Sequence, residues 1–321
     1  MTPGPPLVSV VVPTFDRADE LTATIASLYA SELRAPGSVE LIVVDDGSAE
    51  PAVRYVERIP VPAPFTTRVV RQENQGVGSA RNRGFREAHG PVVLFVDDDM
   101  IVLPDMLQGH LDAHRCVPGS VVFGPSPYVR QVSPTPFTDW VLGLPGDPHA
   151  AGDGPLVAVP VVASGHLSVE RATVPGWEDF YADTMRTPVA EEYELSWRLS
   201  SRGIPVFVAR DVVALHGRQI SLDTFLRQQY GHGKGCGEAA RLAPDALAVA
   251  ELRTVIDRHT RTGSAALPWS LLRAAPARRV LRGLAGAADH HRVPRRIRSA
   301  VFTAASGAAF SAGVRDGLRG P

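Results

Sequence analysis

The chain has 321 residues, of which 44% are hydrophobic and 21% are charged, and its formal net charge is −1. This composition is typical of a globular protein with a substantial core, and it argues against nucleic-acid binding through a strong positive charge. No stretch reaches the roughly 18 apolar residues of a membrane-spanning helix, and the first ten residues lack the pattern of a secretory signal. Cys116 and Cys236 have no motif spacing, which favours a reducing, cytoplasmic location.

Strand and helix patterns alternate along the first hundred residues. Apolar runs predict strands at 7–13, 39–45 and 91–96, and a short strand is expected at 68–72. Helical spacing predicts helices at 19–29 and in the second half of 74–88. Strands joined by helical crossovers predict an α/β fold with a mostly parallel central sheet flanked by helices. Ligands bind such sheets beyond the carboxyl ends of the strands.

The second half of the chain has a less regular pattern. Proline and glycine are frequent in 117–160, which predicts a long irregular excursion. A helix is expected at 191–202 and a strand at 205–216. From Leu222 onward the pattern is helical and rich in alanine and arginine. The glycine-rich segment 231–237 is expected to interrupt these helices, either as a flexible gate or as a hinge.

Three consecutive aspartates, Asp97, Asp98 and Asp99, directly follow the apolar run at 91–96. Carboxylates crowded at the end of a buried strand repel one another and lose hydration, and a cation would relieve both costs. Oxygen ligands of this kind suit Mg²⁺ or Mn²⁺, which in turn commonly hold a diphosphate. The alternative is a solvated acidic turn.

Two further segments follow strands and suit a nucleotide ligand. Asp45 and Asp46 end the strand at 39–45, where a carboxylate can accept hydrogen bonds from a ribose or a base; the alternative is a cap or turn. Gly78 and Arg81 lie where a glycine-bearing turn opens a helix, which allows close approach to a phosphate. There the alternative is helix capping with solvated arginines.

Acids and a histidine follow in the second half. Glu191 and Glu192 begin the helix expected at 191–202. One of them suits a general base, although acids at a helix N-terminus also stabilise the helix without any catalytic role. His216 ends the strand expected at 205–216 and is either structural or, beside a metal, a ligand.

Taken in order, these segments resemble the family-2 glycosyltransferases of the GT-A fold, which transfer sugars from nucleoside diphosphates with inversion. The resemblance covers about residues 7–220 and rests on VSVVVPTFDR (8–17), VVDDGS (43–48), NQGVGSARNRG (74–84), FVDDDM (95–100), ASGHLSVER (163–171), PGWEDF (175–180), EEYELSWR (191–198) and His216. It implies a GT-A catalytic domain at 1–220, with a nucleotide-sugar half at about 1–100 and an acceptor half at about 101–220. Residues 221–321 would form a helical C-terminal extension.

The resemblance also implies roles for individual residues. The donor nucleotide sugar is expected to contact Pro13, Thr14, Phe15, Asp16, Asp46, Gly78, Arg81, Asp97 and Asp98. A divalent metal, Mn²⁺ or Mg²⁺, is expected to bind Asp97, Asp99 and His216. Among the three aspartates, the loss of Asp98 is expected to matter least.

Glu192, with Glu191 beside it, matches the acidic pair that supplies the general base in this family. Family members usually have aspartate at the second position, so the carboxylate of Glu192 stands one methylene further out. His166 stands where many members have asparagine.

The implied activity is metal-assisted transfer from a UDP- or dTDP-sugar to a hydroxyl of a glycan, a lipid-linked molecule or a small molecule, in carbohydrate or natural-product biosynthesis. One alternative is a catalytically impaired nucleotide-sugar-binding protein. Another is a sugar-nucleotide pyrophosphorylase, which is expected to have a glycine-rich loop after the first strand, where this chain has PTFDR.

The C-terminal region is strongly basic. From Leu267 to the end, ten arginines are balanced only by Asp289 and Asp316. An arginine-rich helical tail suits either peripheral contact with the inner face of an anionic membrane or packing on the catalytic domain. No nucleic-acid partner is expected, because no base-stacking motif accompanies these charges.

Overall fold

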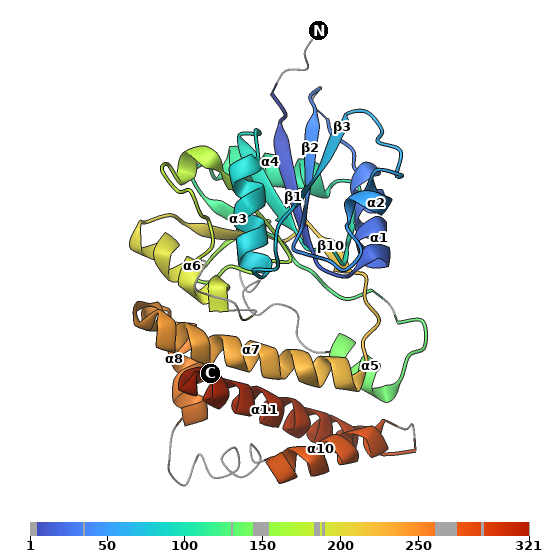
Figure 1. The fold of residues 1–321 in the computed structure, drawn as a ribbon. Coiled ribbons are helices and arrows are strands. Elements are labelled where there is room, and N and C mark those ends of the chain that lie inside the picture. Colours follow the sequence, from blue (N-terminus) through green and yellow to red (C-terminus); the bar gives the residue numbers. More distant parts are fainter. Residues whose placement is uncertain are drawn as a thin grey trace. The chain divides into compact units, whose positions relative to one another are not determined.

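The computed structural model describes residues 5–34, 36–129, 131–143, 154–182, 187, 190–260, 275–289 and 292–320. The chain divides into two compact units (Figure 1). The first comprises Met1–Val129, Gly146–Arg186 and Arg198–Arg218, and the second comprises Arg130–Pro145, Thr187–Trp197 and Gln219–Pro321. Besides the C-terminal region, the second unit thus includes two earlier segments that the sequence analysis assigned to the catalytic domain.

An eight-stranded sheet forms the centre of the first unit, with the strand order β3-β2-β1-β4-β8-β6-β9-β7. Its strands are β1 (Val8–Thr14), β2 (Val39–Asp45), β3 (Phe65–Arg71), β4 (Val92–Val96), β6 (Val121–Phe123), β7 (Leu156–Val159), β8 (His166–Glu170) and β9 (Val206–Ala209). β3, β2, β1 and β4 are parallel neighbours, as are β6 and β9, whereas β8 is antiparallel to β4 and β6, and β7 to β9. The expected α/β architecture is confirmed.

Helices cover both faces of this sheet. They are α1 (Ala18–Tyr29), α2 (Val53–Val56), α3 (Val77–Glu87) and α4 (Met106–Cys116). Val10 of β1 packs in one cluster with Leu21 of α1. The next residue, Val11, points the other way, and a Cβ on Gly84 of α3 would come within 2.1 Å of its Cγ1. Because both faces are covered, all seven residues of β1 are buried, and its sequence is mostly apolar rather than alternating.

A second, two-stranded sheet pairs β5 (Met100–Val102) with β10 (Ala214–His216). The strands are antiparallel, with His216 opposite Met100. The single strand expected at 205–216 is therefore wrong, because the chain turns after β9 and continues in a different sheet. The excursion expected at 117–160 likewise contains β6 and β7 as well as the helix α5 (Pro136–Leu142).

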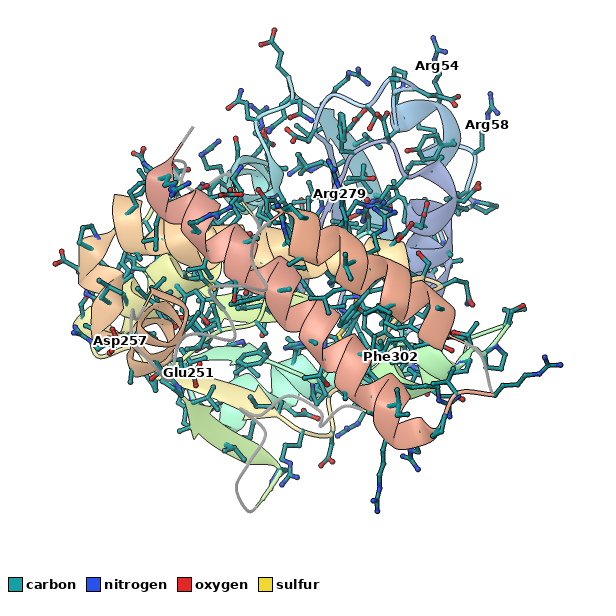
Figure 2. All side chains as sticks on the ribbon, turned by 90° about the horizontal axis from the view of Figure 1, so that it is seen from below. Arg54, Arg58, Glu251, Asp257, Arg279 and Phe302 are labelled. Carbon is teal, nitrogen blue, oxygen red and sulfur yellow. The ribbon has the colours of Figure 1, made fainter. Side chains whose placement is uncertain are left out.

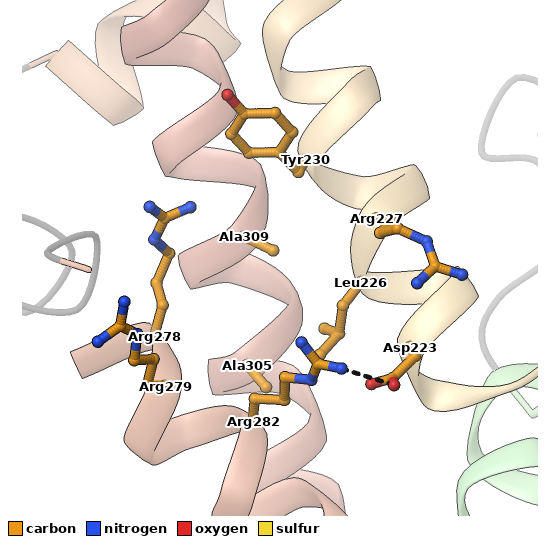
Figure 3. Close-up of a pocket in the computed structure, with 9 residues that line it drawn as sticks. All are labelled: Asp223, Leu226, Arg227, Tyr230, Arg278, Arg279, Arg282, Ala305 and Ala309. Carbon is orange, nitrogen blue, oxygen red and sulfur yellow. Dashed lines mark hydrogen bonds and ion pairs between the residues drawn. The ribbon is translucent and has the colours of Figure 1, made fainter. Parts of the chain in front are cut away.

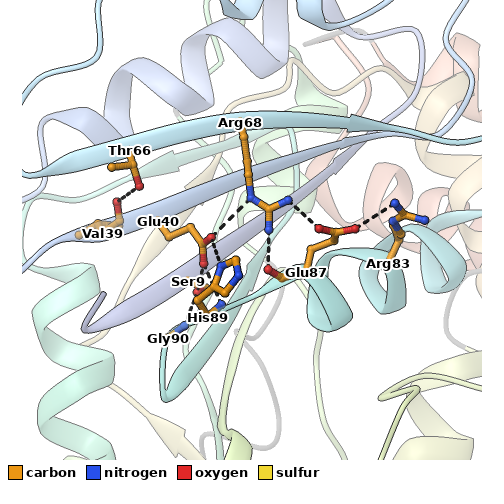
Figure 4. Close-up of polar contacts among 9 residues, drawn as sticks. All are labelled: Ser9, Val39, Glu40, Thr66, Arg68, Arg83, Glu87, His89 and Gly90. Carbon is orange, nitrogen blue, oxygen red and sulfur yellow. Dashed lines mark hydrogen bonds and ion pairs between the residues drawn. The ribbon is translucent and has the colours of Figure 1, made fainter. Parts of the chain in front are cut away.

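A buried carboxylate ties the strands together at the amino end of the sheet (Figure 4). Glu40 accepts hydrogen bonds from Ser9 Oγ at 2.5 Å and from the His89 backbone N–H at 2.9 Å, and Arg68 Nε lies 3.5 Å away. Burial alone would raise the pKa of Glu40, but the bonds from Ser9 and His89 outweigh it and lower the pKa. This cluster joins β1, β2 and β3, so its role is structural.

The second unit consists of helices. These include α5, the first eight residues of α6 (Ala190–Ser201), α7 (Leu222–Leu242), α8 (Ala250–Thr260), α10 (Ala275–Ala288) and α11 (Arg295–Arg319). Phe302 of α11 lies in this unit (Figure 2). Its ring centre is 5.4 Å from that of Phe137 in α5, and the ring of Phe225 in α7 is 5.5 Å from Phe137, both edge to face. Among the described helices, none is both long and apolar enough to cross a bilayer.

The glycines of 231–237 lie inside α7, so the expected interruption is wrong. A Cβ on Gly233 would lie 2.1 Å from the carbonyl oxygen of Phe310, and a Cβ on Gly237 would lie 2.3 Å from that of Val314, both in α11. The same holds for α11, where a Cβ on Gly317 would lie 2.1 Å from the Lys234 carbonyl oxygen of α7. Glycine is needed here for close contact between two helix backbones, not for flexibility.

Candidate active site at the carboxyl edge of the sheet

The carboxyl ends of β1, β2 and β4 meet at one edge of the sheet because these strands are parallel neighbours. The turn 15–17 follows β1, Asp46 follows β2, and the three aspartates follow β4. Asp98 accepts a hydrogen bond from Thr14 Oγ1 at 2.8 Å across this edge. The structure therefore brings together the sequence-predicted donor and metal residues of the first unit.

Asp98 links three segments. Besides its bond from Thr14, its Oδ1 accepts from Arg17 at 2.9 Å, and its backbone carbonyl accepts from Thr24 Oγ1 at 2.7 Å. Asp98 is 5% exposed, and burial raises its pKa to about 6, although Arg17 and Thr14 act in the opposite direction. These contacts give Asp98 a structural role that its middle position in the motif does not indicate.

Asp99 and His216 lie side by side because β5 pairs with β10. The Asp99 Oδ1 atom is 3.6 Å from His216 Nδ1, and Oδ2 is 2.6 Å from Arg218 Nε and 3.5 Å from Arg17. Burial alone would raise the pKa of Asp99, but His216, Arg218 and Arg17 outweigh it and lower the pKa. The carboxylate is therefore held ionised, as a metal ligand must be.

Asp97 pairs with Arg81 of α3 at 2.6 Å. The Asp97 side chain is 28% exposed and that of Arg81 only 3%, and the Arg81 guanidinium also lies 5.1 Å from the centre of the Tyr181 ring. Gly78, one turn earlier in α3, is buried. Arg81 thus fixes the most accessible of the three carboxylates at the sheet edge.

Asp46 holds the loop that leads into α3. Its Oδ1 accepts from Gln72 Nε2 at 2.8 Å and from the Gln75 backbone N–H at 2.9 Å, and its Oδ2 accepts from the Gly76 N–H at 2.8 Å. Gly76 has a φ of 95°, which favours glycine. Contact of Asp46 with the nucleoside base stays a prediction.

The turn after β1 has a constrained backbone. Asp16 has a φ of 53°, unusual for a residue other than glycine, and such conformations cluster at ligand-binding sites. Its N–H donates to Ser48 Oγ at 3.0 Å, and its carboxylate accepts from the Ala49 N–H at 2.7 Å. The neighbouring Phe15 is 46% exposed, so its ring is free to stack on a flat ligand, while Pro13 is buried beneath.

Glu191 and Glu192 occupy the first turn of α6, in the part of that helix that belongs to the second unit. Glu191 is 3% exposed, whereas Glu192 is more accessible. Their position relative to the aspartates stays a prediction.

Comparison with known proteins assigns the segment that carries this edge. Residues 9–140 match the model of the family described as glycosyl transferase family 2. Validoxylamine A glucosyltransferase of Streptomyces hygroscopicus subsp. limoneus is 30% identical over 236 residues, which cover 64% of this chain and 50% of that protein. Its counterpart in S. hygroscopicus subsp. jinggangensis is also 30% identical, with 64% and 54% covered, so the chain spans about half the length of these curated relatives.

Solved structures show the same fold. The mannosyltransferase PcManGT from Pyrobaculum calidifontis, in complex with GDP-Man and Mn²⁺, has a TM-score of 0.56 and 18% identity, covering 95% of this chain and 88% of that one. TarS 1–349 of S. aureus, in complex with UDP-GlcNAc, has a TM-score of 0.52 and 16% identity, covering 92% and 90%. At these identities the likeness concerns the fold alone, and it confirms the GT-A architecture.

Two side chains at this edge of the sheet suit a divalent metal. Asp99 and His216 lie 3.6 Å apart, and the ion pairs of Asp99 keep its carboxylate charged. Within the described residues, no group of three or more histidine, cysteine, aspartate or glutamate side chains is arranged around one point. Two protein ligands suit Mg²⁺ or Mn²⁺, because such ions commonly complete their coordination with water and phosphate oxygens.

Arg17 and Arg218 belong to the site and were missed in the sequence. Both pair with Asp99, from the turn after β1 and from the residue two places after β10. Their only sequence signal is position, since Arg17 ends the PTFDR motif and Arg218 closely follows His216. Both arginines are about 40% exposed, so they remain accessible to an anionic ligand.

His166 lies at one end of a buried series of hydrogen-bonded, neutral histidine rings in the first unit. Its Nε2 lies 3.3 Å from the Pro125 carbonyl oxygen, which can only accept, so Nδ1 accepts from His110 Nε2 at 2.9 Å. The other His110 nitrogen then accepts from Ser168 Oγ at 2.8 Å, and His114 Nε2 donates to the same hydroxyl at 2.8 Å. A proton added to His166 Nδ1 would face the Nε2–H of His110, so two donors would oppose each other.

The buried histidines should therefore lower the stability of the first unit as the pH falls below ~6.5. Burial lowers the pKa of His166 to about 4 and that of His110 well below its usual value, so the unfolded chain binds more protons below pH ~6.5. The stabilisation is complete above pH ~6.5 and is lost toward pH ~4, by about 1.4 kcal/mol per pH unit for each buried ring. Unfolding midpoints should fall less steeply on acidification in His166→Asn; an unchanged slope would show that His166 does not titrate on unfolding.

Proposed function

We propose that the chain is an inverting glycosyltransferase that moves a sugar from a nucleoside-diphosphate sugar to an acceptor hydroxyl. The observation that carries the proposal is the meeting of Thr14, Asp97, Asp99 and His216 at the carboxyl edge of a family 2 domain. Crevices outside the carboxyl ends of such strands are where open α/β sheets bind ligands.

The nucleoside would bind over the turn after β1. The exposed ring of Phe15 offers a stacking surface, and Asp16 is held in a left-handed conformation beside it. Asp46 and Asp97 supply acceptors for base N–H and ribose hydroxyl groups. These features suit uridine or thymidine diphosphate.

The diphosphate would lie against the cationic groups around Asp99. Arg17 and Arg218 are partly exposed and offer planar donors to phosphate oxygens. Asp99 and His216 would hold Mn²⁺ or Mg²⁺, with Asp97 nearby. The metal supplies neutralisation of the charge that develops on the leaving diphosphate. A cationic cradle of this kind favours departure of the nucleotide without covalent catalysis.

Glu192 would act as the general base that accepts the proton of the acceptor hydroxyl. It is the more accessible acid of the first turn of α6. Attack from the face opposite the departing diphosphate is a single displacement and inverts the anomeric centre. The two relatives named validoxylamine A glucosyltransferase make a glucosyl donor and a small natural-product acceptor the first pair to test. A cytoplasmic location, with peripheral contact between the basic C-terminal region and a membrane, is part of the same proposal.

A thermal-shift screen tests donor binding. UDP- and dTDP-sugars, with GDP-mannose for comparison, should raise the unfolding midpoint in the presence of Mn²⁺ and much less in EDTA, because a ligand that binds only the folded state stabilises it. A donor at a hundred times its dissociation constant adds about 2.7 kcal/mol. Absence of any shift across the panel would contradict the function. Release of nucleoside diphosphate with an acceptor mixture then separates an enzyme from a catalytically impaired binding protein.

A further inference from the structure

The second unit contains a cavity of about 530 Å³ between α7, α10 and α11 (Figure 3). Four arginines line it, Arg227 from α7 and Arg278, Arg279 and Arg282 from α10. Leu226 of α7 and Ala305 and Ala309 of α11 line it with apolar side chains, and Asp223 and Tyr230 of α7 complete the lining. The cavity therefore combines a cationic wall with an apolar wall.

Only one of these arginines has an acidic partner within the described part of the chain. Arg282 reaches from α10 to Asp223 of α7, 2.6 Å away, at one end of the cavity. Arg227, Arg278 and Arg279 form no ion pair with any described residue. The cavity thus carries an excess of positive charge that the described side chains do not balance.

Arg278 also has an unsatisfied donor. Its Nε is buried and has no hydrogen-bond partner among the described residues, and its guanidinium lies 6.0 Å from the centre of the Tyr230 ring. Tyr230 does not relieve the arginine, because its hydroxyl donates to Asp316 at 2.9 Å. A buried donor without a partner is costly, and an anion in the cavity would remove that cost.

We propose that this cavity binds the phosphate group of a ligand whose adjoining part is apolar. Guanidinium groups pair with phosphate oxygens through two parallel hydrogen bonds, which lysine or a dipole cannot match. The wall formed by Leu226 and Ala305 accommodates a hydrocarbon or ring next to the phosphate. A lipid headgroup and a soluble phosphorylated compound share this chemistry. The site lies in the second unit and does not depend on the proposed glycosyl transfer.

Calorimetric titration with phenyl phosphate in EDTA and low salt tests the site. Wild-type protein should bind. Arg278→Gln/Arg279→Gln should bind at least about tenfold more weakly, since each hydrogen bond to a charged group contributes about tenfold or more in affinity. The exposed Arg279→Gln alone should show a smaller loss of the same sign, and it guards against misfolding of the double variant. Arg54→Gln/Arg58→Gln, the α2 control, is the matched variant, because Arg54 in α2 and Arg58 two residues after it are both exposed and project into solvent (Figure 2).

Phenol, which lacks the phosphate, should not bind. Equal affinity of wild type and Arg278→Gln/Arg279→Gln for phenyl phosphate would overturn the proposal, as would equal weakening in the α2 control. Flotation with phosphatidylglycerol vesicles, absent with phosphatidylcholine vesicles and lost in the double variant, assigns the phosphate to a lipid. Phenyl phosphate binding without flotation assigns it to a soluble compound.

Discussion

Replacing Glu192 by glutamine should lower sugar transfer by about 10²–10⁴-fold while donor affinity stays unchanged. Glutamine keeps the size and polarity of the side chain but cannot accept the proton of an acceptor hydroxyl at neutral pH. Rates of nucleoside diphosphate release at saturating donor and acceptor give the first quantity, and calorimetry with the donor alone gives the second.

Glu20→Gln is the matched control. Glu20 is an exposed acid in the first turn of α1, so the same substitution there removes the same favourable charge from a helix N-terminus. Transfer should be unaffected in this control. If Glu192→Gln loses donor binding, or retains full transfer, Glu192 is not the base and Glu191 becomes the next candidate.

Gly237→Ala should destabilise the second unit by about 1–3 kcal/mol, the usual cost of overpacking. The new Cβ would lie 2.3 Å from the Val314 carbonyl oxygen and 2.7 Å from the Leu318 backbone nitrogen, so α11 must move away from α7. The cost has to exceed the gain of about 1 kcal/mol that alanine brings to a helix interior. Urea unfolding followed by circular dichroism measures the difference.

Gly231→Ala separates the two effects. Gly231 lies in the same helix, and a Cβ there would meet nothing within 4 Å. This variant should gain up to about 1 kcal/mol from helix propensity alone. Two variants of equal stability would show that α7 and α11 do not pack as closely as described.

Much of the sheet could be predicted from the sequence, because strands covered on both faces consist mainly of apolar residues. The runs that became β1, β2 and β4 are mostly apolar, broken only by Ser9 and Glu40 before their last residues, and polar residues mark the carboxyl end of each. Parallel order then placed Thr14, Asp46 and Asp97 at one edge. The same reasoning could not reveal that β10 pairs with β5, so the partnership of Asp99 with Arg218 was invisible.

The glycines of α7 show the opposite failure. Local propensity correctly rates Gly233 and Gly237 as poor helix formers, but close packing on α11 requires them. Tertiary contacts thereby override the local preference. Motif spacing also assigns Asp98 and Arg81 only to ligand binding. It does not reveal that Asp98 bonds to Arg17 or that Arg81 bonds to Asp97 within the protein.

Calorimetry tests whether a metal bound by Asp99 holds the donor. The stabilising nucleotide sugar is titrated into wild type and Asp99→Asn, with Mn²⁺ and with EDTA. Wild type should lose affinity about tenfold or more in EDTA, and Asp99→Asn should bind as weakly with Mn²⁺ as wild type does in EDTA. Asp105→Asn, an exposed aspartate whose side chain caps nothing, should bind like wild type. Binding to wild type that is indifferent to chelation, or full Mn²⁺-dependent affinity in Asp99→Asn, would contradict the assignment of this edge as a metal-assisted donor site.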